Sequence, residues 1–258
     1  MALSLLQTGL GLVSGSMVGF SLGLVGGGGS ILAVPLMVYL VGVPDPHVAI
    51  GTSAIAVAAN AAVNLASHAR EGSVKWRCAI VFALAGMAGA YGGSSLGKMV
   101  DGQKLLVLFA LLMLVVGALM LRKRSGEGDV TVRLNRGNFL VLVATGFSAG
   151  ALSGFFGIGG GFLIVPALML ATGMPILNAV GSSLVSVTAF GLTTAANYAS
   201  SGYVDWVLAG VFVTGGVFGG FLGTRSAKTL SGKRGALNIV FAVLIFAVAI
   251  YTLVRSLI

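Results

Sequence analysis

The amino-acid sequence predicts an all-α integral membrane protein built from two inverted-topology repeats, each a glycine-broken hairpin followed by three transmembrane helices. Hydrophobic residues make up 57% of the chain and charged residues only 8%, whereas a soluble domain carries about 25% charged residues. Every Asp, Glu, Lys and Arg lies in or beside a short polar break between apolar runs. This distribution is expected because a charge at the centre of a membrane helix costs about 2.5–3.5 kcal/mol. The third observation is an internal duplication.

The apolar runs define about eight long and two short membrane segments. A helix that crosses the hydrocarbon core needs about 20 apolar residues. The long candidates are residues 5–25, 48–67, 79–96, 105–121, 139–156, 180–199, 207–223 and 237–254. The short segments 31–41 and 162–171 each follow a glycine cluster, so we expect a half-helix or the short leg of a hairpin. The predicted organisation is a first transmembrane repeat (1–121), a cytoplasmic linker (122–136) and a second transmembrane repeat (137–258).

The duplication covers nearly the whole of both halves. The matching pairs are GFSLGLVGGGGSILAVPLM from Gly19 with GALSGFFGIGGGFLIVPAL from Gly150, AIGTSA from Ala49 with AVGSSL from Ala179, HAREGSVKW from His68 with YASSGYVDW from Tyr198, and GGSSLGKMVDGQK from Gly92 with FLGTRSAKTLSGK from Phe221. Regular glycine rows, such as Gly15, Gly19 and Gly23, indicate helices whose backbones touch.

Charges in equivalent loops favour inverted repeats. Residues 68–77 carry three cations and one Glu, whereas residues 198–206 carry only Asp205. Residues 225–234 carry four cations, and their counterpart 95–104 carries two with one Asp. Basic loops face the cytoplasm, so equivalent loops fall on opposite sides and each half crosses the membrane an odd number of times. If the glycine cluster merely interrupts one crossing, the count becomes even and the repeats are parallel.

The two glycine clusters are the first candidate binding elements. They comprise Gly26 to Gly29 with Ser30, and Gly157 with Gly159, Gly160 and Gly161. Consecutive glycines do not make a comfortable helix interior, and backbone that leaves the helix in a membrane must be buried or line a wet cavity. A helix restarting at Ser30 or Gly161 would direct free N–H groups towards an anion. The alternative is a tight turn that serves close helix packing.

Small polar side chains are the second candidate set. Thr52 and Ser53 lie near the start of the third segment of the first half, and Ser182 and Ser183 occupy the equivalent place in the second half. Asn60 shares a helical face with Thr52. Hydroxyls and amides can donate to an anion without a fixed charge, although they can equally serve hydrogen bonds between or within helices. We therefore assign substrate binding to Gly27, Gly28, Gly29, Ser30, Thr52, Ser53, Asn60, Gly159, Gly160, Gly161, Ser182 and Ser183.

Other classes of site are not indicated. The chain has one cysteine and two histidines, and it lacks the residue patterns of a catalytic triad, a metal site or a nucleotide loop. We expect no enzyme activity, no cofactor, no metal and no nucleic acid, since the excess of cations is spread over loops. No apolar run contains a carboxylate, so a coupling proton would travel with the substrate or through His47 or His68.

GGGGSILAVPLM followed by AIGTSA, and GIGGGFLIVPAL followed by AVGSSL, resemble the TauE/SafE family of sulfite and organosulfonate exporters. The resemblance implies a multi-pass permease of a prokaryotic cytoplasmic membrane that moves a small sulfur-containing anion, usually outward and driven by an ion gradient, with a proton or cation as coupling partner. An oligomer is compatible with it. The expected function is secondary transport by alternating access between the halves. The alternatives are an anion or small-solute channel and a membrane protein with a purely structural role.

Overall fold

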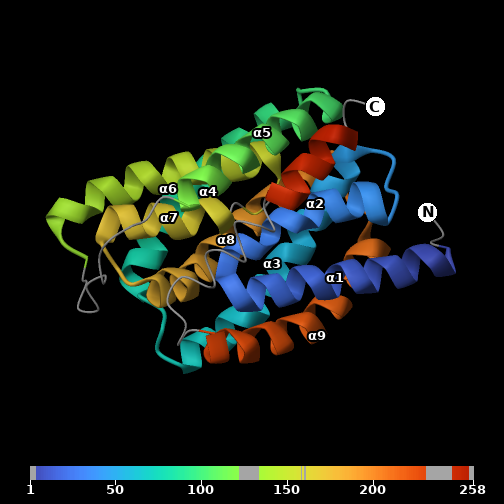
Figure 1. Ribbon diagram of the computed structural model, residues 1–258. Helices are drawn as coiled ribbons and strands as arrows, with labels where there is room; N and C mark the ends of the chain where they lie inside the picture. Colours follow the sequence, from blue (N-terminus) through green and yellow to red (C-terminus); the bar gives the residue numbers. More distant parts are fainter. Residues whose placement is uncertain (1–3, 122–133, 158, 160, 231–245, 256–258) are drawn as a thin grey trace.

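The computed structural model describes residues 4–121, 134–157, 159, 161–230 and 246–255, which are helical and contain no strand. The helices run roughly along one long axis (Figure 1). Their bounds are α1 Leu5–Val25, α3 Pro46–Arg70, α4 Trp76–Gly97, α5 Gly102–Leu121, α6 Arg136–Phe156, α7 Gly161–Thr172, α8 Ile176–Ala199 and α9 Trp206–Leu230, with η1 Gly26–Leu32, α2 Ala33–Pro35 and η2 Leu36–Leu40 between α1 and α3.

Six of these helices are long and apolar enough to cross a membrane. They are α1, α3, α4, α6, α8 and α9, in agreement with six of the eight long segments predicted from the sequence. The other two predicted segments correspond to shorter apolar helices, Gly102–Val115 within α5 and Phe246–Arg255; the first part of the segment predicted at 237–254 lies outside the described residues. Helix α3 begins two residues before the apolar run at 48–67, because Asp45 caps it by accepting from the His47 backbone N–H and Pro46 occupies the first turn.

The first helix of each half packs on the penultimate long helix of the other half, through rows of glycine. A Cβ atom added to Gly19 of α1 would lie 2.6 Å from the Gly216 Cα atom of α9, and one added to Gly150 of α6 would lie 2.6 Å from the Gly86 Cα atom of α4. Such contacts allow no side chain on either backbone. The packing role predicted for the glycine rows is therefore confirmed, and it recurs at equivalent positions in both halves.

The central pair, α3 and α8, runs antiparallel. Gly51 near the start of α3 contacts Tyr198 and Tyr203 at the end of α8, while Gly181 near the start of α8 contacts Ser73 just beyond α3. One end of the bundle, at which α1, α3 and α9 begin, holds His47, and we call it the His47 end. The opposite end holds His68 near the end of α3 and is called the His68 end.

Contacts along the helices fix the remaining directions. α1 runs parallel to α9, because Gly15 faces Phe212 and Gly23 faces Gly220. α3 begins beside the start of α9, because Thr52 bonds to Asp205 just before α9, and it too runs parallel to α9. α6 and α8 run parallel to α4 in the same way. The first helices of the two halves therefore point in opposite directions, and the chain from Gly26 to α3 returns to the end at which α1 began. These directions fit the predicted inverted hairpins; the orientation of the repeats in a membrane stays a prediction.

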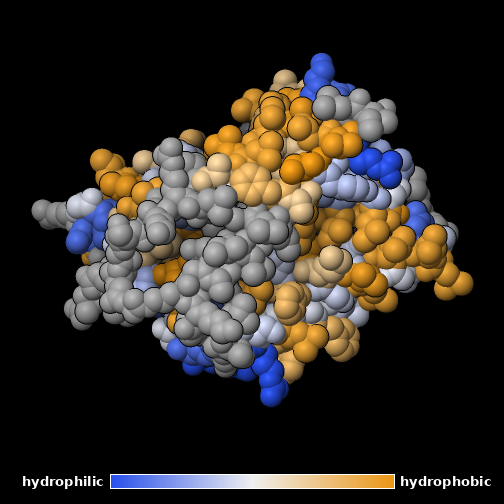
Figure 2. Space-filling model, viewed as in Figure 1, coloured by the Kyte–Doolittle hydropathy of each residue, from blue (hydrophilic) through white to orange (hydrophobic). Residues whose placement is uncertain are grey.

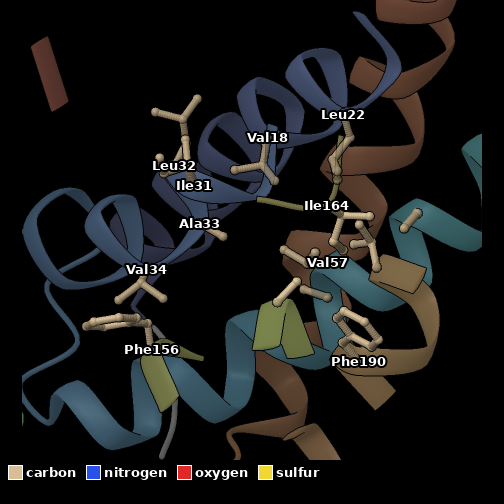
Figure 3. Packing of buried hydrophobic residues seen from close by; sticks show 14 of the residues in the cluster. Val18, Leu22, Ile31, Leu32, Ala33, Val34, Val57, Phe156, Ile164 and Phe190 are labelled. Carbon is tan, nitrogen blue, oxygen red and sulfur yellow. The ribbon is translucent and has the colours of Figure 1, made fainter. Parts of the chain in front are cut away.

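The halves meet in an apolar core, while much of the outer surface is also apolar. Val18, Leu22, Ile31, Val57 and Ile164 are buried together where α1, η1, α3 and α7 converge (Figure 3). Large hydrophobic side chains are exposed on the outside, and Figure 2 shows them over much of the visible described surface. A large exposed apolar surface is the property expected of helices that face lipid.

Candidate functional site

Both glycine clusters redirect the chain through left-handed backbone. Gly26 ends α1 with φ +69°, and Gly157 and Gly159 precede α7 with φ +67° each. This region strains residues that carry a Cβ atom, so glycine is required at these positions. Helix α7 begins at Gly161 as predicted. The expected restart at Ser30 is wrong, because residues from Gly26 to Leu32 form a continuous buried 3₁₀ helix. The tight winding is possible since the glycines bring no side chains into the turn.

The two clusters meet in the interior. A Cβ atom on Gly27 would lie 2.6 Å from the Gly161 Cα atom, so the two backbones are in direct contact. Val187 of α8 packs on Gly27, and Val57 of α3 packs on Gly159. Val57 is seen in Figure 3 beside Ile164 and Phe190. In this state the contact between the halves is closed and apolar, with valine from each central helix against the glycine backbone.

Polar groups of the glycine clusters are paired inside the closed contact. The Gly27 N–H donates to Ser183 Oγ (3.2 Å), whose hydroxyl donates to the Val180 carbonyl (2.7 Å). Ser30 Oγ donates to the Gly27 carbonyl (2.9 Å), and Ser53 Oγ donates to the Ile50 carbonyl (3.0 Å). Ser30, Ser53 and Ser183 are fully buried. Gly27 and Ser183, predicted from separate motifs and separate halves, are thus hydrogen-bonded to each other.

Thr52 and Ser182 lie away from this contact and from each other. Thr52 Oγ1 accepts from the Asp205 N–H (2.9 Å) just before α9, at the His47 end. Ser182 Oγ accepts from the Lys75 N–H (2.9 Å) just before α4, at the His68 end. Each hydroxyl therefore satisfies a backbone donor near the start of a helix. In this state both hydroxyls form hydrogen bonds between a helix and a loop. This is the structural role that the sequence left open as the alternative to substrate binding.

Asn60 is the predicted residue with the most unusual surroundings. Its side chain is fully buried, and within the described residues neither Nδ2 nor Oδ1 has a hydrogen-bond partner. It packs against Gly216 of α9, where a Cβ atom would overlap with the amide. One turn later, Asn64 is satisfied: its Nδ2 donates to the Asn60 carbonyl (2.9 Å) and its Oδ1 accepts from Thr224 (3.1 Å). A buried amide without a partner costs about 1–3 kcal/mol, which is what a ligand-binding group can recover.

The remaining predicted residues are packed in the interior or lie outside the described part of the chain. Gly28 is buried. Gly29 lies against α1, since its Cβ atom would come within 2.8 Å of the Leu22 Cα atom. Gly160 lies outside the described residues. Among the described residues no group of three His, Cys, Asp or Glu side chains could hold a metal ion.

Sequence reasoning missed Val57, Val187 and Thr194, which lie on the two central helices. Val57 and Val187 occupy equivalent positions of the duplication, which is the signal that could have found them. Ser186 and Thr194 of α8 are fully buried, and their hydroxyls have no partner among the described residues. Around the contact of the two glycine clusters, the described side chains offer neutral donors. Such donors can hold a small anion, because hydrogen bonds are strong in a low dielectric.

Comparison with known proteins gives consistent matches over almost the whole chain. The model of the family "Sulfite exporter TauE/SafE" matches residues 11–252. A probable membrane transporter protein of Xylella fastidiosa strain 9a5c is 54% identical over 248 residues, covering 94% of each chain. Probable membrane transporter protein YunE of Bacillus subtilis is 29% identical and covers 87% of this chain and 88% of its own. A probable membrane transporter protein of Methanocaldococcus jannaschii is 27% identical, with coverages of 84% and 87%. No solved structure gives a significant match.

Proposed function

The chain belongs to the sulfite exporter TauE/SafE family, and on this premise we propose that it exports a small sulfur-containing anion, such as sulfite or an organosulfonate. It is a membrane transporter by its relatives and by its six apolar helices. The finer proposal is secondary transport by alternating access, with the substrate bound where the two glycine clusters meet.

The unpartnered amide of Asn60 is the observation that carries this proposal. A fully buried side chain with two unsatisfied polar atoms is rare in proteins, and it is a candidate ligand-binding group when it lies beside the contact of two repeats. Asn60 Nδ2 can donate to an oxygen of a sulfite or sulfonate group without a countercharge. A neutral site of this kind binds a small anion and releases it again, which a transporter requires.

The contact of Gly27 with Gly161 fits a closed state of the transport cycle. The Gly27 N–H donates to Ser183 Oγ here, so a separation of the halves would release the N–H as a donor for the substrate. Gly27 belongs to the first half and Ser183 to the second. A rocking movement of one half against the other would therefore create and remove the site, and it would also act on the glycine-packed pairs α1–α9 and α4–α6, because each pair joins the two halves.

We assign the His68 end to the cytoplasm. The connection from α3 to α4 lies at this end and carries Arg70, Lys75 and Arg77 against Glu71. Its equivalent, the connection from α8 to α9, lies at the His47 end and carries Asp205 without a cation. Short cytoplasmic loops are enriched in Lys and Arg. The linker 122–136 follows α5, which begins at the His47 end, and so it is cytoplasmic in this orientation.

Counterflow in liposomes tests the function. Purified protein is reconstituted into vesicles loaded with unlabelled sulfite, and uptake of external radiolabelled sulfite is followed at equal pH. We expect saturable uptake that requires internal sulfite and is reduced by an organosulfonate such as sulfoacetate more than by sulfate. Conductance without saturation would indicate a channel, and absence of flux for every sulfur anion offered would contradict transport of this substrate class.

A glycine variant connects that activity to the site. Gly27→Ala places a Cβ atom 2.6 Å from the Gly161 Cα atom, so we expect counterflow per folded molecule to fall strongly. Gly92→Ala is the matched control, because a Cβ atom there meets nothing within 4 Å. Both proteins are compared at equal amounts of monodisperse material. Equal counterflow by the two variants would place the substrate elsewhere.

A further inference from the structure

Three rings gather at the His47 end, between the two halves of the chain. His47 of α3 lies 5.5 Å from Tyr203 and 6.2 Å from Tyr198 between ring centroids, and the two tyrosine rings lie 6.2 Å apart. His47 belongs to the first half, and Tyr198 and Tyr203 belong to the second. Any change in the charge of the imidazole is therefore felt directly at a contact between the two halves.

Two polar atoms in this cluster are buried without a partner. They are His47 Nδ1 and the Tyr198 hydroxyl, neither of which has a hydrogen-bond partner within the described part of the chain. The Tyr198 side chain is fully buried. Each unsatisfied atom costs about 1–3 kcal/mol, so two such atoms within one ring cluster need an explanation. At the other histidine, His68 Nδ1 lies 3.2 Å from Ser73 Oγ.

Charged groups surround the cluster on the side of the bundle end. Asp45 caps α3, and its carboxylate accepts from the backbone N–H of His47 (2.8 Å). A shallow hollow is lined by Asp45, His47, Asp101 and Gln103, and it gives the imidazole a route to water. On the other face of Tyr198, Lys98 Nζ lies 6.0 Å from the ring centroid and is held by Asn197 and Ser201. Asp205, at the same end, accepts from the Val207 and Leu208 N–H groups.

We propose that His47, with Tyr198 as its hydrogen-bond partner, is the proton-binding site that couples anion export to the proton gradient. The inference rests on the proposed function. Histidine is the side chain that gains a proton between about pH 5 and pH 8. In the proposed orientation the His47 end faces the exterior, so the imidazole takes a proton from water in the hollow. The carboxylates of Asp45 and Asp101 line the same hollow.

Coupling follows from the position of the cluster. No apolar segment of the sequence contains an Asp or Glu, so the carboxylates that often carry protons in transporters are missing from the membrane segments. Protonation of His47 adds a positive charge between α3 and α8 and converts the buried Nδ1 atom into a donor. The Tyr198 oxygen, which has no partner among the described residues, accepts from it in the proposed protonated state. Protonation therefore changes the stability of the contact between the halves. Outward movement of the anion is in this way linked to inward movement of the proton.

Two flux measurements on the same vesicles separate coupling from transport. Equal-pH counterflow reports the anion site, and net sulfite movement driven by a pH gradient reports coupling. We expect His47→Gln to retain counterflow within about twofold and to lose at least about tenfold of the gradient-driven movement, a change of about 1.4 kcal/mol. His68→Gln is the matched control and should behave as the unmodified protein. Gradient-driven movement by His47→Gln at the unmodified rate would overturn the proposal, as would its loss in His68→Gln alone.

An NMR titration tests the site without any transport. The chain has two histidines, so ¹⁵N-histidine labelling of the His68→Gln protein observes His47 alone. The proposal requires His47 to titrate between about pH 5 and pH 8 and requires Tyr198→Phe to shift the midpoint. A His47 signal that does not change over this range, or a midpoint unchanged by Tyr198→Phe, would refute it. Absence of sulfite counterflow in the unmodified protein would instead refute the proposed function, and the titration would still decide on the proton site.

Discussion

Equivalent positions in the two halves of this molecule hold an amide in one case and an aromatic ring in the other. Asn60 of α3 packs against Gly216 of α9, and Phe190 of α8 packs against Gly86 of α4. Phe190 also stacks on Phe82, with 6.2 Å between ring centroids. Gly19 meets Gly216 in one helix pair as Gly150 meets Gly86 in the other. The duplicated scaffold is thus symmetric where backbones touch and asymmetric where a side chain is left without a partner.

This difference separates structural from functional constraint. Phe190 fills its space with apolar contacts, which stabilise the second half. Asn60 fills the equivalent space with an amide that gains nothing from its neighbours in the closed state. If the first half supplies most polar contacts to the substrate, the second half serves mainly as the surface against which it closes. Three sets of variants test this comparison, in order from the largest expected effect to the smallest, and a fourth test follows at the end.

The glycine seams should be equally intolerant of side chains in the two halves. Gly19→Leu and Gly150→Leu each place a side chain into the backbone of the partner helix. Because even modest overpacking costs about 1–3 kcal/mol, we expect neither variant to give monodisperse protein. Gly92→Leu and Gly210→Leu are controls, since a Cβ atom at either site meets nothing within 4 Å. Size-exclusion chromatography of detergent extracts measures the outcome. A tolerated Gly19→Leu beside a lost Gly150→Leu would show that the seams are not equivalent.

Lys98 tests a contact between the two halves at the His47 end. Its ammonium group donates to the Asn197 carbonyl (2.9 Å), to Asn197 Oδ1 (2.8 Å) and to Ser201 Oγ (2.8 Å), and so joins the end of α4 to the end of α8. We expect Lys98→Met to reduce the free energy of unfolding by about 1–3 kcal/mol, measured by thermal unfolding in detergent. Lys104→Met, at an exposed position, should change it little. Equal effects would mean that the three hydrogen bonds do not hold the helix ends together.

The smallest effects are expected at Thr52 and Ser182, where the halves are alike. Each hydroxyl accepts one backbone N–H at 2.9 Å, from Asp205 and from Lys75 respectively. Thr52→Val and Ser182→Ala should each lower stability by about 0.6 kcal/mol, the average for a hydrogen bond between membrane helices, and should leave the affinity for sulfite unchanged. A large loss of affinity in either variant would return these hydroxyls to the substrate site.

The sequence allowed the scaffold to be predicted better than the site. The positions of the apolar segments and the close-packed glycine rows could be predicted, because they follow from local composition and from spacing along a single helix. The 3₁₀ helix from Gly26 to Leu32 could not be foreseen, because four glycines impose no local preference and contacts with Gly161 decide their path. The partners of Thr52 and Ser182 are loops of the opposite half, and no spacing along the chain reveals them. The substrate residues themselves stay predictions.

The most direct test of the account is a single comparison of Asn60→Leu with Phe190→Leu. Leucine is close to asparagine in shape and needs no hydrogen bonds, so Asn60→Leu should keep or raise the thermal stability, because removing an unsatisfied buried amide is neutral or favourable. The same variant should weaken sulfite counterflow at least about tenfold, or about 1.4 kcal/mol. Phe190→Leu should lose stability and keep the affinity of the folded molecules. Full counterflow by Asn60→Leu would contradict the assignment of this amide to the anion and, with it, the central claim.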